Sequence, residues 1–400
     1  MRSCSRRTFV QGMAVACAAY PVLAPSTLSG QPAPRGVEPR RRLGENILGE
    51  LNEQIAALLR KHRIVGGSIA IFDRGELVFD HGYGHANLAP PQPVTPQTLF
   101  SLASVSKSVT GIGTLLLVEQ GRLDLNARVV EVLKDLQPLR GQHIADPRFR
   151  EITVHQLLFH GGGLIHDAPT VDEQGRGEEF DREDSENRYR LLMTKPLLCD
   201  PGTEHHYSNA GFMVLGLVIE HVTGQDYEAF IHEHVLGPMG IQRMHREHGT
   251  AYGADETHRF GVEHQPVERS LGNWLATAGA IARFAAEVAG SGGRRPFLSP
   301  RMNELMFAMP ASLKVQRPRG PHVGLGWDTV VPYPGGRHRF SKNGGKAGVQ
   351  AWLEHLEYNI DWAVMLNTNS PKDERPKPMG EIRRLALATF ERALGIESGG

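Results

Sequence analysis

The chain has 400 residues, of which 40% are hydrophobic and 22% are charged, so it is long enough for one large or two ordinary soluble domains. Lys plus Arg and Asp plus Glu number 44 each, which gives no electrostatic reason to expect a nucleic-acid partner or an anionic membrane surface. No apolar run reaches the roughly 18 residues that a membrane-spanning helix requires. Disordered, fibrous and integral-membrane classes are therefore excluded.

Residues 1–30 are predicted to be a leader that precedes the fold. Arg6 and Arg7 are followed by a mildly apolar stretch, 12–23, which ends in small residues and proline. This order resembles a twin-arginine export signal and predicts export of the folded chain to the periplasm or the medium; the alternative is a disordered basic tail. The Pro- and Arg-rich residues 31–45 are expected to be a flexible lead-in.

Periodicity then predicts a sheet assembled from both ends of the chain around a helical insertion. The N-terminal part is expected to contain a helix, a β-hairpin, a proline-rich loop and a second helix, at 46–60, 68–79, 89–96 and 105–120. Residues up to about 270 are mainly helical in pattern, with two polar interruptions, 137–150 and 167–190. The acidic run in the second interruption is interpreted as a solvated loop. The last third is expected to form three strands and a closing helix, at 323–331, 348–353, 362–366 and 380–394.

The strongest candidate for chemistry is Ser104-Val105-Ser106-Lys107, an S-x-x-K motif at the start of a predicted helix. Residues three apart share a helix face, so the Lys107 ammonium can reach the Ser104 hydroxyl. A helix N-terminus adds free N–H groups and positive potential, which favour an oxyanion. Serine is a poor nucleophile until a base takes its proton, and lysine is such a base where its pKa is lowered. The alternative is a solvated helix start with Ser104 as a plain cap.

A second motif, Tyr207-Ser208-Asn209, follows a turn and precedes an apolar helix at 212–222. Tyr207 could relay a proton or be the base itself. Asn209 could hold the lysine and a substrate amide through the two ends of its side chain. Alone, the pattern is equally that of a turn into a helix.

A third motif, Lys342-Asn343-Gly344-Gly345, precedes a predicted strand. Its glycines allow the backbone to approach a ligand and leave an N–H free to complete an oxyanion hole, and the lysine could bind a substrate carboxylate. The alternative is a plain glycine turn between two strands. A second K-x-G sequence at 346–348 leaves the assignment open from spacing alone.

In order and separation, the three motifs resemble those of the penicillin-recognising serine hydrolases, which include class C β-lactamases, D-Ala-D-Ala carboxypeptidases and family VIII-type esterases. The resemblance covers roughly residues 45–390 and includes shorter similar segments at 152–160, 201–203, 324–327 and 366–369. It implies an α/β (α+β) fold of the β-lactamase/transpeptidase type, with an antiparallel sheet flanked by helices beside a mostly helical part. We expect one domain at 46–395 with the active site in the cleft between these parts, the α/β part at 46–105 and 275–395 and the helical part at 106–274.

The resemblance also implies residue roles. Ser104 would be the acylated nucleophile, Lys107 its proton partner and Tyr207 the general base or acid. The register of the family's K/H-x-G motif selects Lys342, and the substrate-binding residues would be Asn209, Lys342, Asn343 and Gly344. The backbone N–H groups of Ser104 and Gly345 would form the oxyanion hole.

Two positions depart from the family pattern. The run at 160–163 is His-Gly-Gly-Gly, where relatives often have His-Thr-Ser-Gly. Asn343 replaces a small hydroxyl residue that would hydrogen-bond a β-lactam carboxylate. These departures weaken the expectation of efficient penicillin cleavage more than that of hydrolase chemistry.

Cysteine and histidine usage predicts no metal site. Only Cys199 lies outside the leader, and it is interpreted as a structural thiol, since one thiol can form neither an intramolecular disulfide nor a cysteine framework for a metal. None of the histidine clusters has the H-E-x-x-H spacing of a zinc hydrolase. These clusters lie at 205–206, 232–234 and 245–248.

Together these features predict an exported, cofactor-free serine hydrolase that acts through an acyl-enzyme on a small-molecule or peptidoglycan-type substrate. The scissile group is an ester, a D-amino-acid peptide or a β-lactam. The alternative is a penicillin-binding-like sensor or cell-wall binding protein that acylates without turnover, and a metal-dependent hydrolase is disfavoured by ligand spacing. The identity of the base and the oligomeric state are left open.

Overall fold

The computed structural model describes residues 42–138, 142–169, 184–246, 273–311, 313, 320–368 and 377–396. All of these belong to one compact unit, Arg41–Gly400. The predicted leader, residues 31–41 of the lead-in and most of the acidic run lie outside the described residues.

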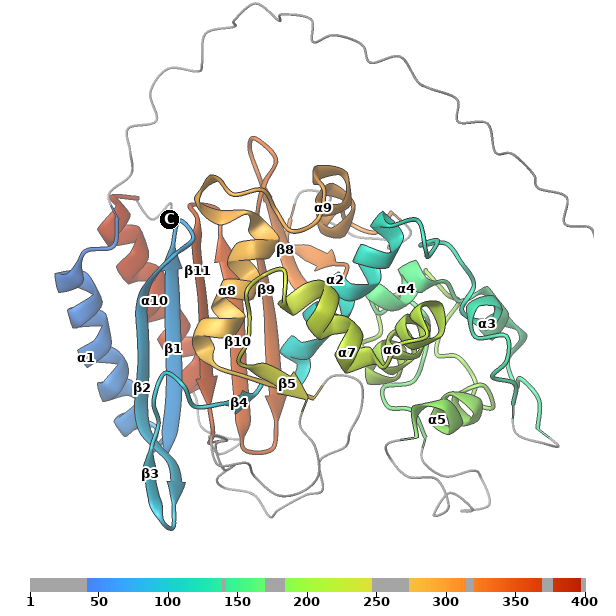
Figure 1. Ribbon diagram of the computed structural model, residues 1–400, viewed down its shortest axis with the longest axis horizontal. Coiled ribbons are helices and arrows are strands. Elements are labelled where there is room, and N and C mark those ends of the chain that lie inside the picture. Colours follow the sequence, from blue (N-terminus) through green and yellow to red (C-terminus); the bar gives the residue numbers. More distant parts are fainter. Residues whose placement is uncertain are drawn as a thin grey trace, which may run out of the picture. The chain divides into compact units, whose positions relative to one another are not determined.

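An antiparallel sheet of eight strands lies at the centre of this unit, in the order β3-β2-β1-β11-β10-β9-β8-β7 (Figure 1). Near its middle the sheet joins the two ends of the chain, because β1 runs antiparallel to β11 from Gly67 opposite Leu366 to Asp73 opposite Ile360. The predicted sheet from distant segments is therefore confirmed. The strands are β1 (Gly66–Asp73), β2 (Glu76–Leu88), β3 (Pro91–Pro93), β7 (His322–Gly324), β8 (Trp327–Tyr333), β9 (Arg337–Lys346), β10 (Val349–Leu356) and β11 (Ile360–Leu366).

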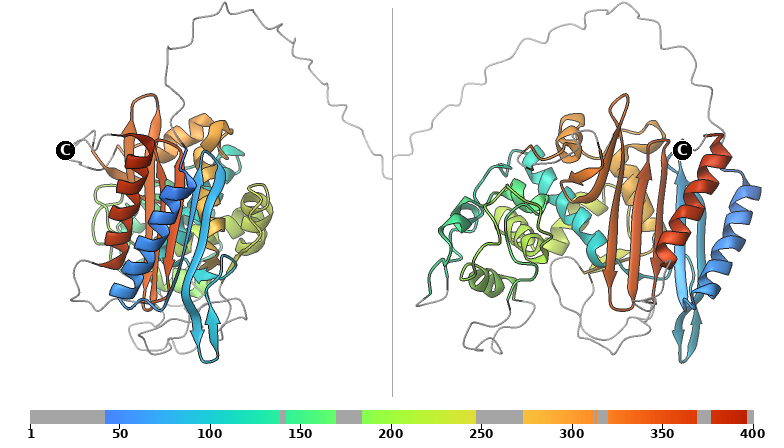
Figure 2. Two further views of the ribbon diagram at one scale, coloured as in Figure 1. Left: turned by 90° about the vertical axis from the view of Figure 1, so that its left-hand side faces the viewer. Right: turned by 180° about the vertical axis from the view of Figure 1, so that it is seen from behind.

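Both faces of the central strands are buried, because side chains alternate between two layers of helices. Ile69 and Ile71 of β1 pack with α1 (Glu45–Lys61) and α10 (Pro378–Leu394). Ala70 and Phe72, which alternate with these two residues along β1, pack in a different core cluster together with residues of α8 (Ala278–Ala289). Figure 2 shows α1 and α10 on one side of the sheet and α8 on the other. This arrangement explains why β1 and β11 are buried along their whole length.

The remaining described helices follow one another between β4 and β7. They are α2 (Ser106–Glu119), α3 (Val129–Val132), α4 (Val154–Leu158), α5 (Ser185–Leu192), α6 (Asn209–Thr223), α7 (Tyr227–Ile231) and α9 (Pro300–Phe307), with 3₁₀ turns at Ala103–Val105, Pro147–Glu151 and Ser291–Gly293 and a π-helical turn at His232–Leu236. A small second sheet has the order β4-β6-β5, with β4 at Phe100–Ser101, β5 at Met244–Arg246 and β6 at Trp274–Ala276. Within the described ranges, no helix combines the length and apolar character needed to cross a membrane.

Two predicted segments are corrected by the structure, and the plain-turn alternative for the third motif is excluded. Lys342–Gly345 lies inside strand β9, because each residue pairs with β10; the turn is made by the next residues, with Gly348 at φ +71°. The predicted strand at 323–331 is broken at Gly326, whose φ of +85° starts the reversal between β7 and β8. The proline-rich loop at 89–96 contains the short edge strand β3, which is tolerated there because an edge strand can lack ladder donors.

Candidate active site

Ser104 lies in the 3₁₀ turn immediately before α2. The preceding Ala103 has a φ of +44°, a left-handed conformation that a residue with a Cβ adopts only when the surroundings hold it. The backbone of Trp274 on β6 supplies that hold, because its carbonyl accepts from Leu102 N at 2.8 Å and its N–H donates to Ser106 Oγ at 3.2 Å. The small sheet thus fixes the turn that presents Ser104.

The Ser104 hydroxyl lies between two other predicted residues. Lys107, one helical turn along, brings Nζ to 3.3 Å from Ser104 Oγ. Tyr207 OH donates to the same oxygen at 2.6 Å, across more than one hundred residues of sequence. Ser208 caps α6 by accepting a hydrogen bond from Gly211 N at 3.0 Å, which fixes the chain directly after Tyr207, where the helix begins. The structure therefore brings Ser104, Lys107 and Tyr207 together.

The surroundings shift the pKa values of Lys107 and Tyr207 in opposite directions. Lys107 is buried, and burial together with the charge of Lys342 lowers its pKa to about 7, although Asp328 and Asp167 act in the opposite sense. Burial raises the pKa of Tyr207 to about 12, with the Ser104 hydrogen bond opposing the rise. Near neutral pH, a substantial fraction of Lys107 is therefore the free amine, while Tyr207 keeps its proton.

Strand β9 contacts the serine turn, which is the 3₁₀ turn Ala103–Val105 that presents Ser104, at Gly344. A Cβ on Gly344 would lie 2.2 Å from Leu102 O and 3.1 Å from Ser104 N, so only glycine permits this approach. The next residue, Gly345, is exposed and pairs with Gln350 on β10. Gly345 thus follows directly after the residue at which β9 contacts the turn that presents Ser104, and its part in an oxyanion hole stays a prediction.

Lys342 and Asn343 both contact Asp328, the second residue of β8. Lys342 is buried and its Nζ makes a very short contact with Asp328 Oδ1. Asn343 donates to Asp328 Oδ2 from its backbone N at 3.1 Å and from Nδ2 at 2.8 Å. Lys342 Nζ also lies 5.4 Å from the centre of the Tyr207 ring. Burial lowers the pKa of Lys342 and the Asp328 carboxylate counteracts this shift.

Asn209 is held by residues of the loop that precedes α6. Its Nδ2 donates to Asp167 Oδ1 at 2.8 Å, and its backbone N donates to His166 O at 2.7 Å. Asp167 also contacts His166 Nδ1 at 2.7 Å and is exposed. Asn209 is thus oriented by a carboxylate, with its side chain partly accessible.

His160 completes the wall behind Tyr207. Its ring centre lies 4.3 Å from that of Tyr207, and its Nδ1 accepts from Ser208 N at 3.1 Å. Burial, with Lys342 and Lys107 adding to it, holds the pKa of His160 well below its usual value. His160 therefore supports Tyr207 as a neutral ring, in a left-handed backbone conformation with φ +59°.

Sequence reasoning missed the partner groups Asp328 and Asp167. Asp328 follows the 324–327 segment that resembles the family, and this position was the available signal. Asp167 was assigned to the acidic segment interpreted as a solvated loop, yet its carboxylate holds Asn209. Both carboxylates influence Lys107 and Tyr207 electrostatically, so they belong to the site.

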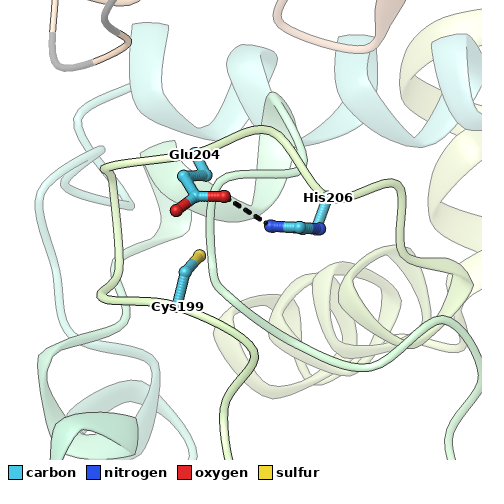
Figure 3. A group of neighbouring side chains, drawn as sticks. All are labelled: Cys199, Glu204 and His206. Carbon is cyan, nitrogen blue, oxygen red and sulfur yellow. Dashed lines mark hydrogen bonds and ion pairs between the residues drawn. The ribbon is translucent and has the colours of Figure 1, made fainter.

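A separate group that could hold a cation lies just before Tyr207. Cys199, Glu204 and His206 point toward one another, and their ligand atoms all lie within 4.8 Å (Figure 3). Glu204 Oε2 and His206 Nε2 are 2.9 Å apart. Thiolate, imidazole and carboxylate are donors that zinc accepts, although burial raises the pKa of the Cys199 thiol and a bound cation would have to displace its proton. Spacing alone did not associate Cys199 with this histidine.

Comparisons with known proteins give a family match and two relatives. The profile of the family described as Beta-lactamase matches residues 51–387. Esterase EstB of Burkholderia gladioli is 34% identical over 255 residues, which are 60% of this chain and 62% of EstB. Protein flp of Staphylococcus aureus strain MW2 is 30% identical over 206 residues, covering 50% of this chain and 39% of flp. The alignments thus span less than two thirds of either relative.

A solved structure shows the same fold. "Crystal structure of a class C beta lactamase" superposes with a TM-score of 0.66 at 19% identity, covering 86% of this chain and 98% of the other. The predicted β-lactamase/transpeptidase-like fold, an antiparallel sheet with flanking helices, is therefore confirmed.

Proposed function

We propose that this chain, which belongs to the Beta-lactamase family, is a serine hydrolase that cleaves a carbonyl substrate through an acyl-enzyme on Ser104. One observation carries the proposal: Ser104 Oγ lies 3.3 Å from Lys107 Nζ and 2.6 Å from Tyr207 OH. A hydroxyl in contact with a lysine of lowered pKa and a protonated phenol has both a proton acceptor and a proton relay.

In acylation, the neutral Lys107 amine takes the Ser104 proton as Oγ attacks the substrate carbonyl carbon. The negative charge that develops on the carbonyl oxygen is stabilised by the N–H groups of Ser104 and Gly345. The bond to the leaving group then breaks, and the proton on Lys107 passes through Tyr207 to the leaving atom. This order makes Lys107 the base, because its pKa of about 7 suits a base near neutral pH and the raised pKa of Tyr207 suits a donor.

Deacylation repeats these steps with water. The Lys107 amine takes a proton, relayed through Tyr207, from the water that attacks the acyl carbon, and this proton returns to Ser104 Oγ as the bond between Oγ and the acyl carbon breaks. Asn209, fixed by Asp167, would orient the acyl group. No metal ion or organic cofactor enters this scheme.

The proposed substrate is an ester, with D-amino-acid peptides and β-lactams as the other members of the class. The printed name of EstB, a relative at 34% identity, favours the ester. Departure of Asn343 from the family's hydroxyl residue points the same way, because asparagine holds a carboxylate with a different reach.

The test is turnover of a short-chain p-nitrophenyl ester and of a chromogenic cephalosporin by the purified protein. Ser104→Ala should abolish ester turnover, while Ser185→Ala on α5 should not. Mass spectrometry should find an acyl adduct on the peptide that contains Ser104. Equal activity of Ser104→Ala and the wild type, with no adduct, would overturn the proposal. A single burst of product without turnover would instead support the acylating sensor.

We also propose export by the twin-arginine route, on the leader sequence alone. Replacing Arg6 and Arg7 together by lysine should retain the protein in the cytoplasm. Cell fractionation measures this, and unchanged export of the double variant would contradict the route.

A further inference from the structure

We propose that Asp328 is a built-in carboxylate that occupies the anion-binding position of the active site, so that the enzyme selects acyl donors without a carboxylate near the scissile bond. This inference rests on the proposed hydrolase function and defines its substrate class. It also makes Asp328 a specificity-determining residue.

The first observation is how completely Asp328 uses the donors around it. One oxygen contacts the Lys342 ammonium, and the other accepts from Asn343 N at 3.1 Å and Nδ2 at 2.8 Å. Ammonium and amide donors converging on one carboxylate form the usual arrangement of a carboxylate-binding site. Here the carboxylate comes from the protein.

The second observation is where these donors lie. Lys342 and Asn343 are the two residues before Gly344, the point at which β9 touches the serine turn. Two residues of strand span roughly 7 Å, so the anion position is within reach of an acyl chain attached to Ser104. Lys342 Nζ also lies 5.4 Å from the ring of Tyr207, whose hydroxyl contacts Ser104 Oγ.

Electrostatics explains why an incoming carboxylate is disfavoured. To reach Lys342 it must displace Asp328, which then loses three donors, or sit beside it as a second negative charge. Asp167 adds a further negative charge, which is close enough to raise the pKa values of Lys107 and Tyr207. An uncharged acyl donor neither displaces Asp328 from its donors nor places a second negative charge beside it.

A purely structural role for Asp328, bracing β8 against β9, predicts a different outcome. Loss of a brace lowers stability and reduces the hydrolysis of all substrates alike. Loss of a charge that selects substrates changes the ratio between a charged and an uncharged substrate. The ratio is therefore the decisive measurement.

The test uses two esters with the same leaving group and acyl length, p-nitrophenyl pentanoate and mono-p-nitrophenyl glutarate, which differ in a terminal methyl or carboxylate. The wild type should have the higher kcat/KM for the pentanoate. Asp328→Asn should raise the glutarate-to-pentanoate ratio by about tenfold or more, chiefly through a lower KM for the glutarate. Asp135→Asn, at an exposed aspartate on the helical part, is the matched control and should leave the ratio unchanged.

A double variant tests whether Lys342 causes the rise in the glutarate-to-pentanoate ratio. If the freed Lys342 binds the substrate carboxylate, then Asp328→Asn combined with Lys342→Met should lose the tenfold gain. Persistence of the gain without Lys342, or an unchanged ratio in a folded Asp328→Asn protein, would overturn the proposal.

A binding measurement separates this proposal from the hydrolase assignment. Calorimetric titration of Ser104→Ala with N-phenylpentanamide and N-phenylglutaramate needs neither turnover nor the Asp328 variant to fold. We expect the uncharged ligand to bind more tightly, and tighter binding of the glutaramate would overturn the selectivity. Absence of hydrolysis of both esters by the wild type would count against the hydrolase function alone.

Discussion

Two regions of the molecule bury a charged side chain, one on β10 and one on α2, and they treat the charge differently. Toward α10, the Glu354 carboxylate is almost fully buried and receives four hydrogen bonds, from Arg339, Trp352 and two nitrogens of Arg383. Toward α2, the buried Lys107 ammonium contacts the Ser104 hydroxyl and the rings of Tyr207 and Phe212 among the described residues.

The difference teaches which buried charge supports structure and which supports chemistry. Glu354 is paired with the guanidinium groups of Arg339 and Arg383, so its buried charge is compensated by its neighbours. No carboxylate of the described residues is in direct contact with Lys107, and burial moves its pKa to about 7, where it can exchange a proton. A buried charge that is paired with opposite charges supports the structure, whereas a buried ionisable group without such a partner can exchange protons.

The largest expected effect is on activity at the poorly compensated site. Lys107→Met should reduce kcat/KM for the p-nitrophenyl ester by about 10³-fold, because the serine loses its base. Its unfolding free energy should stay the same or rise, since a buried ammonium without a carboxylate partner is removed. Steady-state kinetics and urea unfolding measure the two quantities. Retained activity would transfer the role of base to Tyr207.

The opposite pattern is expected at the compensated site. Glu354→Gln should lower the unfolding free energy by about 3 kcal/mol, because two partly buried guanidinium groups lose the buried counterion that they share. The same variant should keep kcat/KM within about twofold, because Glu354 contacts no residue of the Ser104 group. Asp200→Asn, which breaks the exposed pair with Arg148, is the control and should cost less than about 1 kcal/mol in urea unfolding. A large kinetic defect in Glu354→Gln would erase the contrast between the regions.

A third change tests the contact between β9 and the serine turn. Gly344→Ala should lower kcat by about 10²-fold, since its Cβ would clash with Leu102 O and move the Gly345 N–H away from the reacting oxygen. Gly49→Ala on α1, where an added Cβ meets nothing within 4 Å, should be neutral or slightly stabilising. Normal kinetics in Gly344→Ala would mean that β9 does not supply the oxyanion donor.

The smallest expected effect is a shift in pH dependence. The kcat/KM of the wild type should rise with pH through about 7, because Lys107 acts as a base only after losing its proton. The Asp167 carboxylate raises the pKa of Lys107, so Asp167→Asn should move this acid limb to lower pH. Asp200→Asn should leave the limb in place. A limb that moves to higher pH in Asp167→Asn would contradict the assignment of Lys107.

Local spacing could predict the parts of the site that local structure builds. Ser104 and Lys107 share one turn of chain, and Ser208 caps the helix next to Tyr207, so each motif was visible by itself. The family resemblance supplied the meeting of Ser104 with Tyr207, which no periodicity reveals.

The groups that tune the site depend on pairing between separate segments, which composition does not encode. Asp328 reaches Lys342 only because β8 and β9 are adjacent in the sheet, and Asp167 reaches Asn209 only through the fold of the loop before α6. The plain-turn alternative for the run at 342–345 rested on its two glycines. Its strand geometry comes from the partner strand β10.

The central pairing of β1 with β11 has a consequence for biosynthesis. These strands lie roughly 300 residues apart in sequence, so the middle of the sheet has a very high contact order and closes only when almost the whole chain is available. During synthesis, the hydrophobic edge of β1 must wait for its partner, exposed to chaperones and to other nascent chains. Truncation anywhere before β11 should therefore yield an aggregating polypeptide in place of a smaller active one.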